Sequence, residues 1–260
     1  MGKVISTTHF LNESPIRKED RSLLIDTNVL FAYVYEPHVF NEAATLILEG
    51  AVKSGLSIYC GMSVRTEFLE LQRKTILTEQ LLSMLSSKTK WKISHALRAE
   101  IQKHKIWLDQ QPAKNELPIL TDGRLKQIKK TFTPSGHSGQ IGWMKFCNEY
   151  LSDLYSSWKT HSEKLGLNYL GARESEQEKD LFNKPLKWSE AYELISKTGL
   201  SSNDALILNL FLSSKISHLA TFDFDMAYGF LAEKNNSQFV VVPDSIYNRD
   251  VKTLQHSFDF

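Results

Sequence analysis

The sequence lacks the features that mark secretion or membrane insertion. Its 260 residues include two cysteines, Cys60 and Cys147, and neither has the partner spacing of a metal site. Both are interpreted as small core residues of a protein in a reducing compartment. No apolar run approaches the roughly 20 residues of a membrane span, and the first residues lack the apolar core of a signal peptide. These absences predict a cytoplasmic protein without a membrane partner.

Signatures of several enzyme classes are also missing. The chain has no Gly-rich loop that could cradle phosphates and no nucleophile elbow, and its eight histidines are scattered. Phe222-Asp223-Phe224-Asp225 looks like the Asp-x-Asp of haloacid-dehalogenase phosphatases, but those enzymes carry it near the start of the chain, and here 35 residues follow. A Toprim-type site would add Glu49, which lies far away on a predicted amphipathic helix. Neither reading is favoured.

What the chain does have is a set of four acidic residues in apolar surroundings. Asp26 follows the run Leu23-Leu24-Ile25, and Asp223 follows a second apolar run; Glu67 and Asp204 lie near the starts of predicted helices. A carboxylate is costly to bury unless a cation compensates it. Four such residues predict oxygen ligands for a hard cation, Mg²⁺ or Mn²⁺, at one site.

The order of predicted elements indicates an α/β fold. Short apolar strands alternate with amphipathic helices over 21–74 and again over 166–250, which favours a central parallel, twisted sheet flanked by helices. Residues 1–20 are predicted to be a polar N-terminal arm, and 75–165 a basic helical insertion without strands. Within the insertion, apolar residues from Met144 to Leu165 recur every three or four positions, which predicts one continuous helix.

A parallel sheet would bring the acidic residues together. Ligands of open parallel sheets bind beyond the carboxyl ends of the strands. Asp26 and Asp223 end or follow predicted strands, and Glu67 and Asp204 follow strand or loop segments, so all four are expected at that edge. Four carboxylates in one pocket repel one another unless cations neutralise them.

In this order the motifs resemble those of PIN-domain nucleases. The segments are Ile25-Asp26-Thr27-Asn28, Thr66-Glu67, Asn203-Asp204-Ala205-Leu206-Ile207 and Ala220-Thr221-Phe222-Asp223-Phe224-Asp225, with a closing strand Phe239-Val240-Val241-Val242-Pro243. The resemblance covers roughly 21–74 and 166–245. It implies a PIN-like three-layer fold with a large helical insertion, and a metal-dependent endonuclease, chiefly an endoribonuclease. The segment 75–165 is longer than the short helical pair expected there, so toxin, RNA-processing and defence roles stay open.

The resemblance also implies roles for single residues. Asp26, Glu67, Asp204 and Asp223 would be the catalytic, metal-binding quartet, and Asp225 either a further metal-site acid or the cap of a helix starting at Met226. Thr27, Asn28 and Thr221 would orient the carboxylates, or be ordinary polar residues at strand ends. RNA is the implied substrate; a protein partner, an antitoxin-like inhibitor and a homodimer stay open. The alternative function is a catalytically inactive PIN-like module that binds RNA or a partner.

Charge is divided unevenly along the chain. The segment 71–170 has 16 basic and 8 acidic residues, whereas the rest has 15 and 22. The excess predicts a surface that holds a polyanion beside the metal site, or a merely solvated helical face. The candidate nucleic-acid contacts are Arg65, Arg124, Lys126, Lys129 and Lys130, with a second basic group at Lys88, Lys90, Lys92, Arg98, Lys103 and Lys105. Trp91, Trp107, Phe132 and Trp143 lie nearby and either stack on bases or lie in the core.

Overall fold

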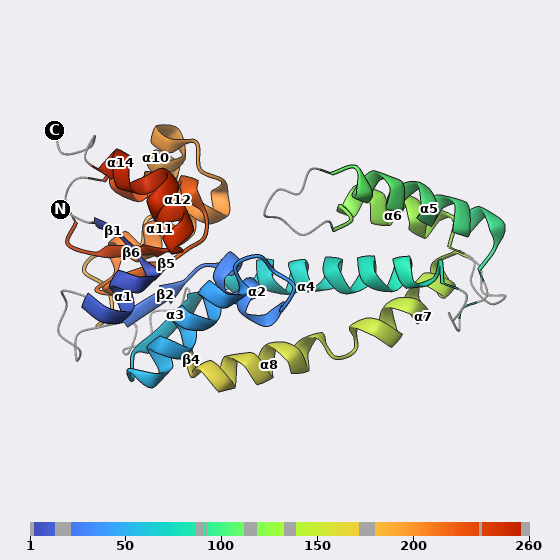
Figure 1. The fold of residues 1–260 in the computed structure, drawn as a ribbon, viewed down its shortest axis with the longest axis horizontal. Coiled ribbons are helices and arrows are strands. Elements are labelled where there is room, and N and C mark those ends of the chain that lie inside the picture. Colours follow the sequence, from blue (N-terminus) through green and yellow to red (C-terminus); the bar gives the residue numbers. More distant parts are fainter. Residues whose placement is uncertain are drawn as a thin grey trace. The chain divides into compact units, whose positions relative to one another are not determined.

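The computed structural model of the chain describes residues 3–13, 22–86, 91, 93–111, 119–132, 139–171, 180–233 and 236–255. The chain divides into two compact units (Figure 1). Unit 1 comprises Met1–Phe68 and His161–Phe260, and unit 2 comprises Leu69–Thr160. The sequence predicted the insertion at 75–165. Within the described residues, none of the helices combines the length and apolar character that a membrane crossing requires.

Unit 1 is built on one six-stranded, all-parallel sheet, so the predicted α/β class with a parallel sheet is confirmed. The strand order is β1-β6-β5-β2-β3-β4. Strands buried on both faces read as continuous apolar runs rather than alternating ones. Leu23, Leu24 and Ile25 follow that rule, since all three are fully buried. The strands are β1 Lys3–Ser6, β2 Ser22–Ile25, β3 Ser57–Gly61, β4 Leu167–Leu170, β5 His218–Ala220 and β6 Phe239–Val242.

Helices fill the connections between these strands. Those entirely within unit 1 are α1 Thr7–Glu13, α2 Thr27–Val34, α3 Asn41–Lys53, α10 Trp188–Thr198, α11 Ser202–Ser213, α12 Phe224–Leu231, α13 Asp244–Ile246, the π-helix η2 Tyr247–Val251 and α14 Lys252–Gln255. Helices α4 (Met62–Ser83) and α8 (Leu154–Leu165) each contribute to both units. Their lengths were not expected from the sequence, which predicted a helix from Met62 to about Lys74.

The prediction of a polar arm over residues 1–20 is wrong for its described part. Lys3–Ser6 forms strand β1, which pairs in parallel with β6 over four residues, and Thr7–Glu13 forms α1. The hydroxyl of Thr7 also donates to the carbonyl of Val242 at 3.2 Å. A four-residue edge strand has too little sequence pattern to stand out, and its partner lies at the other end of the chain.

Unit 2 is helical and has its own core. Besides its parts of α4 and α8 it contains α5 (His95–Asp109), α6 (Asp122–Lys130) and α7 (Gly139–Leu151). The continuous helix predicted from Met144 to Leu165 is wrong, because α7 ends at Leu151 and α8 begins at Leu154. Met144 is 59% exposed, whereas Trp143 and Phe146 are buried, so the inward face is not the predicted one.

Aromatic residues form the centre of that core. Phe132 and Phe146 are fully buried, Trp143 is 9% exposed, and Trp91 and Trp107 pack partly buried against them. The rings of Phe132 and Trp143 meet edge to face with centroids 5.3 Å apart. The prediction that Trp91, Trp107, Phe132 and Trp143 stack on RNA bases is therefore wrong, because these side chains pack in or against the core.

Candidate active site

The site starts from the central strand β2. This strand lies between β5 and β3, where the direction of strand order reverses, and open α/β sheets bind ligands in the crevice beyond that point. Asp26 is the residue immediately after β2. Because Ile25 pairs with Ala220, Asp26 and Thr221 leave neighbouring strands side by side. The backbone N–H of Asp26 donates to the carbonyl of Ala220 at 3.0 Å.

Asp26 is also the N-cap of helix α2, which the sequence did not predict to start there. Its Oδ1 accepts a hydrogen bond from the Thr27 N–H at 2.6 Å. Aspartate is among the favoured N-caps because its oxygen satisfies an N–H that the helix leaves unpaired. A strand that ends on a capping residue turns directly into a helix, and this fixes the carboxylate at the strand end.

Three polar groups hold the Asp26 carboxylate in place. Oδ2 accepts from the Thr221 hydroxyl at 2.7 Å and from the Asn28 amide at 2.8 Å. The Asn28 side-chain oxygen in turn accepts from the N–H of Phe222 at 3.0 Å, and so joins α2 to the segment after β5. The predicted supporting residues Thr27, Asn28 and Thr221 thus all bond to Asp26.

Glu67 reaches the same network from helix α4, which follows β3. Its Oε2 accepts a hydrogen bond from the Thr27 hydroxyl at 3.0 Å. Thr27 therefore contacts two acids, one through its N–H and one through its hydroxyl. Sequence pattern alone gave no signal for this contact, because the two residues are separated by a whole helix and strand.

Asp204 and Asp223 lie at the starts of two further helices. Asp223 is the N-cap of α12, and its Oδ1 accepts from the N–H of Asp225 at 2.8 Å. Asp204 lies in the first turn of α11, where Ser201 is the N-cap and donates its hydroxyl to Asp204 Oδ2 at 2.5 Å. From the sequence, Ser201 or Ser202 was predicted to cap this helix, and the structure identifies Ser201 as the cap. The spacing Ser-x-x-Asp, typical of a capping box, could have identified its second role.

Asp225 is exposed and differs from the four other acids in its setting. The predicted alternative, that Asp225 caps a helix starting at Met226, is wrong. Helix α12 begins at Phe224, and Asp223 caps it instead. The Asp225 carboxylate raises the pKa of Asp223 electrostatically, and the Asp223 N–H in turn donates to the Thr221 hydroxyl that bonds to Asp26.

The electrostatics of the site are those of mutually repelling carboxylates. Asp26 is 2% exposed, and burial raises the pKa of its carboxyl to about 7, with Asp204 and Glu67 raising it further and the hydrogen bonds from Thr221 and Thr27 opposing the rise. Burial likewise raises the pKa of Asp223, with Asp204 and Asp225 adding to it. Loss of the ionised form on burial and beside like charges is the expected behaviour of carboxyl groups. Asp204 couples the other two acids.

The structure brings the four acids to one edge but does not close them around a point. In the part of the chain that the structure describes, no group of three His, Cys, Asp or Glu side chains is arranged to hold an ion as it stands. Pairwise links connect Asp26 with Glu67 through Thr27, and electrostatic coupling connects Asp204 with Asp26 and Asp223.

The predicted nucleic-acid contacts lie in different settings. In unit 1, the Arg65 guanidinium lies 5.7 Å from the centre of the Tyr169 ring. In unit 2, Arg124 stacks on Trp107 at 3.6 Å, whereas Lys126 and Lys130 are exposed on the same helix and Lys129 is partly exposed. Lys88, Lys90 and Lys92 lie outside the described residues.

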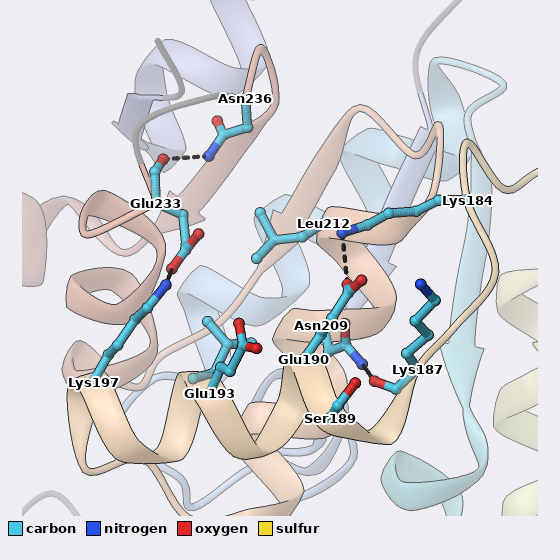
Figure 2. Close-up of a pocket in the computed structure, with 11 residues that line it drawn as sticks. Lys184, Lys187, Ser189, Glu190, Glu193, Lys197, Asn209, Leu212, Glu233 and Asn236 are labelled. Carbon is cyan, nitrogen blue, oxygen red and sulfur yellow. Dashed lines mark hydrogen bonds and ion pairs between the residues drawn. The ribbon is translucent and has the colours of Figure 1, made fainter.

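A pocket of about 480 Å³ lies apart from the acidic quartet, and none of the four acids lines it (Figure 2). Two ion pairs flank it, Lys184 with Glu190 at 2.6 Å and Lys197 with Glu233 at 3.3 Å. Figure 2 shows the charged side chains that line it, of which Glu190, Glu193 and Lys197 belong to α10. The pocket therefore adds no group to the site beyond β2.

Comparison with protein-family models, with curated proteins and with solved structures finds no match for this chain.

Proposed function

We propose that this chain is a metal-dependent endonuclease that cleaves RNA, with Asp26, Glu67, Asp204 and Asp223 as its acidic quartet and a PIN-like three-layer fold. The proposal rests mainly on the environment of the Asp26 carboxyl. This carboxyl is buried, oriented by three hydrogen-bond donors and surrounded by further acids. A group in that setting is costly to ionise unless a cation is present.

The donor set fits a hard divalent cation. All four side chains offer carboxylate oxygens, the ligands that Mg²⁺ and Mn²⁺ prefer, and no sulfur or nitrogen ligand belongs to the set. Asp26, Glu67, Asp204 and Asp223 would hold the ion, with Asp225 as an outer acid. When bound, the ion would act as a Lewis acid on the phosphodiester and supply nucleophilic water at neutral pH.

The other residues would prepare the acids for that task. Hydrogen bonds from Thr221 and Asn28 fix one oxygen of Asp26, and the Thr27 N–H fixes the other, so the carboxylate cannot rotate away from the crevice. The same donors favour its ionised form. The Thr27 hydroxyl restrains Glu67 in the same way. Hydrolysis by water rather than by a ribose hydroxyl would leave a 5′-phosphate and a 3′-hydroxyl.

Two features support RNA hydrolysis at this edge. Asp26 directly follows the central strand β2, at the end of the sheet where ligands of all-parallel folds usually bind. Three acids of the quartet also lie at or near helix N-termini, where N–H groups favour an anionic phosphate.

The alternative, an inactive module that binds RNA or a partner, is favoured by the open arrangement of the acids.

The decisive experiment measures cleavage of end-labelled single-stranded RNA by the purified chain with Mg²⁺ or Mn²⁺. The parent is expected to release fragments with 5′-phosphates, and Asp26→Asn to lower the rate by more than about 100-fold. Asp109→Asn removes an exposed acid of unit 2 that pairs with Lys105, and it should cleave like the parent.

Three results would contradict the proposal. Activity that persists in EDTA would exclude metal dependence, and a 2′,3′-cyclic phosphate product would exclude attack by water. Absence of cleavage by the folded parent, together with RNA binding, would establish the inactive module instead. Cleavage of DNA alone would leave the metal chemistry intact and overturn the choice of RNA.

A further inference from the structure

The feature concerned is one face of helix α6 in unit 2. Leu125 and Ile128 point from this helix into the aromatic core of the unit. Lys126 and Lys130 are exposed on the opposite face, whereas Lys129 lies at its edge, partly exposed and near enough to Cys147 of α7 to influence that thiol electrostatically. The spacing of three and four residues makes the three lysines neighbours on the helix surface. We call these three residues the α6 lysines.

The α6 lysines differ from the other basic residues of unit 2 that the structure describes. Arg73 and Lys74 bond to Glu70 and Asp122, Lys103 bonds to Glu100, and Lys105 bonds to Asp109. Arg98 donates to a backbone carbonyl, and Lys145 and Lys159 also have interaction partners. Among the residues that the structure describes, none forms a hydrogen bond or ion pair with Lys126, Lys129 or Lys130.

Arg124, on the same helix, has the interaction partners that the α6 lysines lack among the described residues. Its guanidinium stacks on Trp107 at 3.6 Å and donates to Nδ1 of His104 at 3.0 Å. His104 is fully buried and bonds to Glu100 through Nε2 at 3.0 Å. Arg124 therefore serves the packing of α6 against α5. It is removed from the predicted nucleic-acid contacts, and the α6 lysines remain.

The acid one turn before Lys126 on the same helix is Asp122, and its carboxylate is already paired with Arg73 and Lys74. Lys129 influences the Cys147 thiol electrostatically, but burial raises the pKa of that thiol, which stays neutral at physiological pH. Lysines in the last turn gain from the helix dipole, which explains Lys129 and Lys130 in part. It does not explain why three like charges are neighbours on the helix surface, since neighbouring like charges destabilise a helix.

We propose that the α6 lysines bind the phosphate backbone of RNA, the polyanion whose spaced negative charges match three neighbouring ammonium groups that have no ion-pair partner among the described residues. The proposal deepens the proposed function, because it rests on RNA as the substrate and assigns unit 2 to holding it. Phosphate contacts by lysine are independent of base sequence. Base stacking is not assigned to Trp91, Trp107, Phe132 and Trp143, because these residues pack in or against the core of this unit.

The test is fluorescence anisotropy with a labelled single-stranded RNA of about 20 nucleotides, in EDTA so that cleavage plays no part. The parent is compared with Lys126→Gln/Lys129→Gln/Lys130→Gln between about 50 and 250 mM KCl. Three lost contacts should lower affinity by about 10- to 100-fold near 100 mM salt and make the slope of log K against log [KCl] shallower by about 2. Replacement of the same residues by arginine should retain both.

The matched control is Lys103→Gln/Lys105→Gln/Lys159→Gln, which removes the same charge from the same unit at residues that already have partners. Its salt slope should equal that of the parent. The proposal is overturned if the α6 variant binds like the parent, if the control weakens binding equally, or if the parent does not bind RNA. RNA binding that depends on the α6 lysines, without any cleavage, would refute the proposed nuclease activity and support the RNA-binding surface. Cleavage by a protein whose RNA affinity does not change in the α6 variant would support the nuclease activity and refute the RNA-binding surface.

Discussion

The most direct consequence of the site geometry is that Asp26 makes the metal-free protein less stable as pH rises. The pKa of this carboxyl is about 7 in the folded chain and near 3.8 without the fold. A group whose pKa is raised on folding favours the folded state while it is protonated. Its contribution is complete below about pH 4 and is lost as pH rises through about 7.

The size of the effect follows from the two pKa values. Each unit of difference corresponds to about 1.4 kcal/mol, so the whole shift amounts to about 4 kcal/mol, of which about 3 kcal/mol falls between pH 4.5 and pH 8.5. Asp223, whose pKa is also raised, acts in the same direction. Such a loss is a large fraction of the 5–15 kcal/mol, roughly, that stabilises a typical domain.

The difference in stability between Asp26→Asn and the parent should therefore depend on pH. Asparagine cannot ionise, so the variant avoids the loss at high pH. It keeps an oxygen for the Thr27 N–H but turns an amide donor toward the Asn28 amide, a conflict that costs about 1 kcal/mol. We expect the variant to be about as stable as the parent near pH 4.5, where the parent has already lost about 1 kcal/mol, and about 3 kcal/mol more stable near pH 8.5.

Urea unfolding in EDTA at both pH values, followed by circular dichroism, measures this difference. Excess Mg²⁺ at the higher pH should restore stability to the parent and leave Asp26→Asn nearly unchanged, because only the parent retains the full ligand set. A variant that is less stable than the parent by the same amount at both pH values would refute the reasoning. Asp26 would then be a structural hydrogen-bond acceptor that is ionised throughout.

Other residues give further expectations. Thr221→Val removes the hydroxyl that donates to Asp26, so the pKa of Asp26 should rise further, and the pH-dependent loss of stability should be larger and extend to higher pH in the same urea titrations. Phe146→Ala should lower the free energy of unfolding by roughly 3–5 kcal/mol because the ring is fully buried in the core of unit 2, whereas Ile141→Ala, 61% exposed on the same helix, should change it by less than about 0.5 kcal/mol. Gly123→Ala should stabilise the protein by about 0.5–1 kcal/mol, since nothing lies closer than 3.9 Å to the new methyl group. Gly229→Ala should instead destabilise it, because the methyl group would lie 2.8 Å from Leu200 and 3.2 Å from Leu208, and thermal melts of the two variants should shift in opposite directions.

Local pattern was sufficient where a segment's own residues decide its structure. Strand β2 is a short run of apolar residues that ends at a capping aspartate, and β6 is four apolar residues before a proline, so both were predicted and with them the parallel α/β class. The same pattern predicted that Asp26 and Asp223 would follow strands. It failed for β1, whose pairing depends on a strand at the far end of the chain, and for the helix predicted across Met144 to Leu165, where regular spacing continued through a break at residues 152–153.

Tertiary structure decided the hydrogen-bond partners and the burial of each side chain. The sequence determined that acids would gather at one sheet edge, since parallel strands end there together. Only the fold decided that Thr27 would bond both Asp26 and Glu67, and that Asp26 would be buried enough to raise its pKa. Arg124 and Lys126 are two residues apart on one helix, yet helix α5 supplies partners for the arginine and none for the lysine among the described residues. Hydrogen bonds and burial depend on groups brought in from distant segments, and local sequence carries no record of those groups.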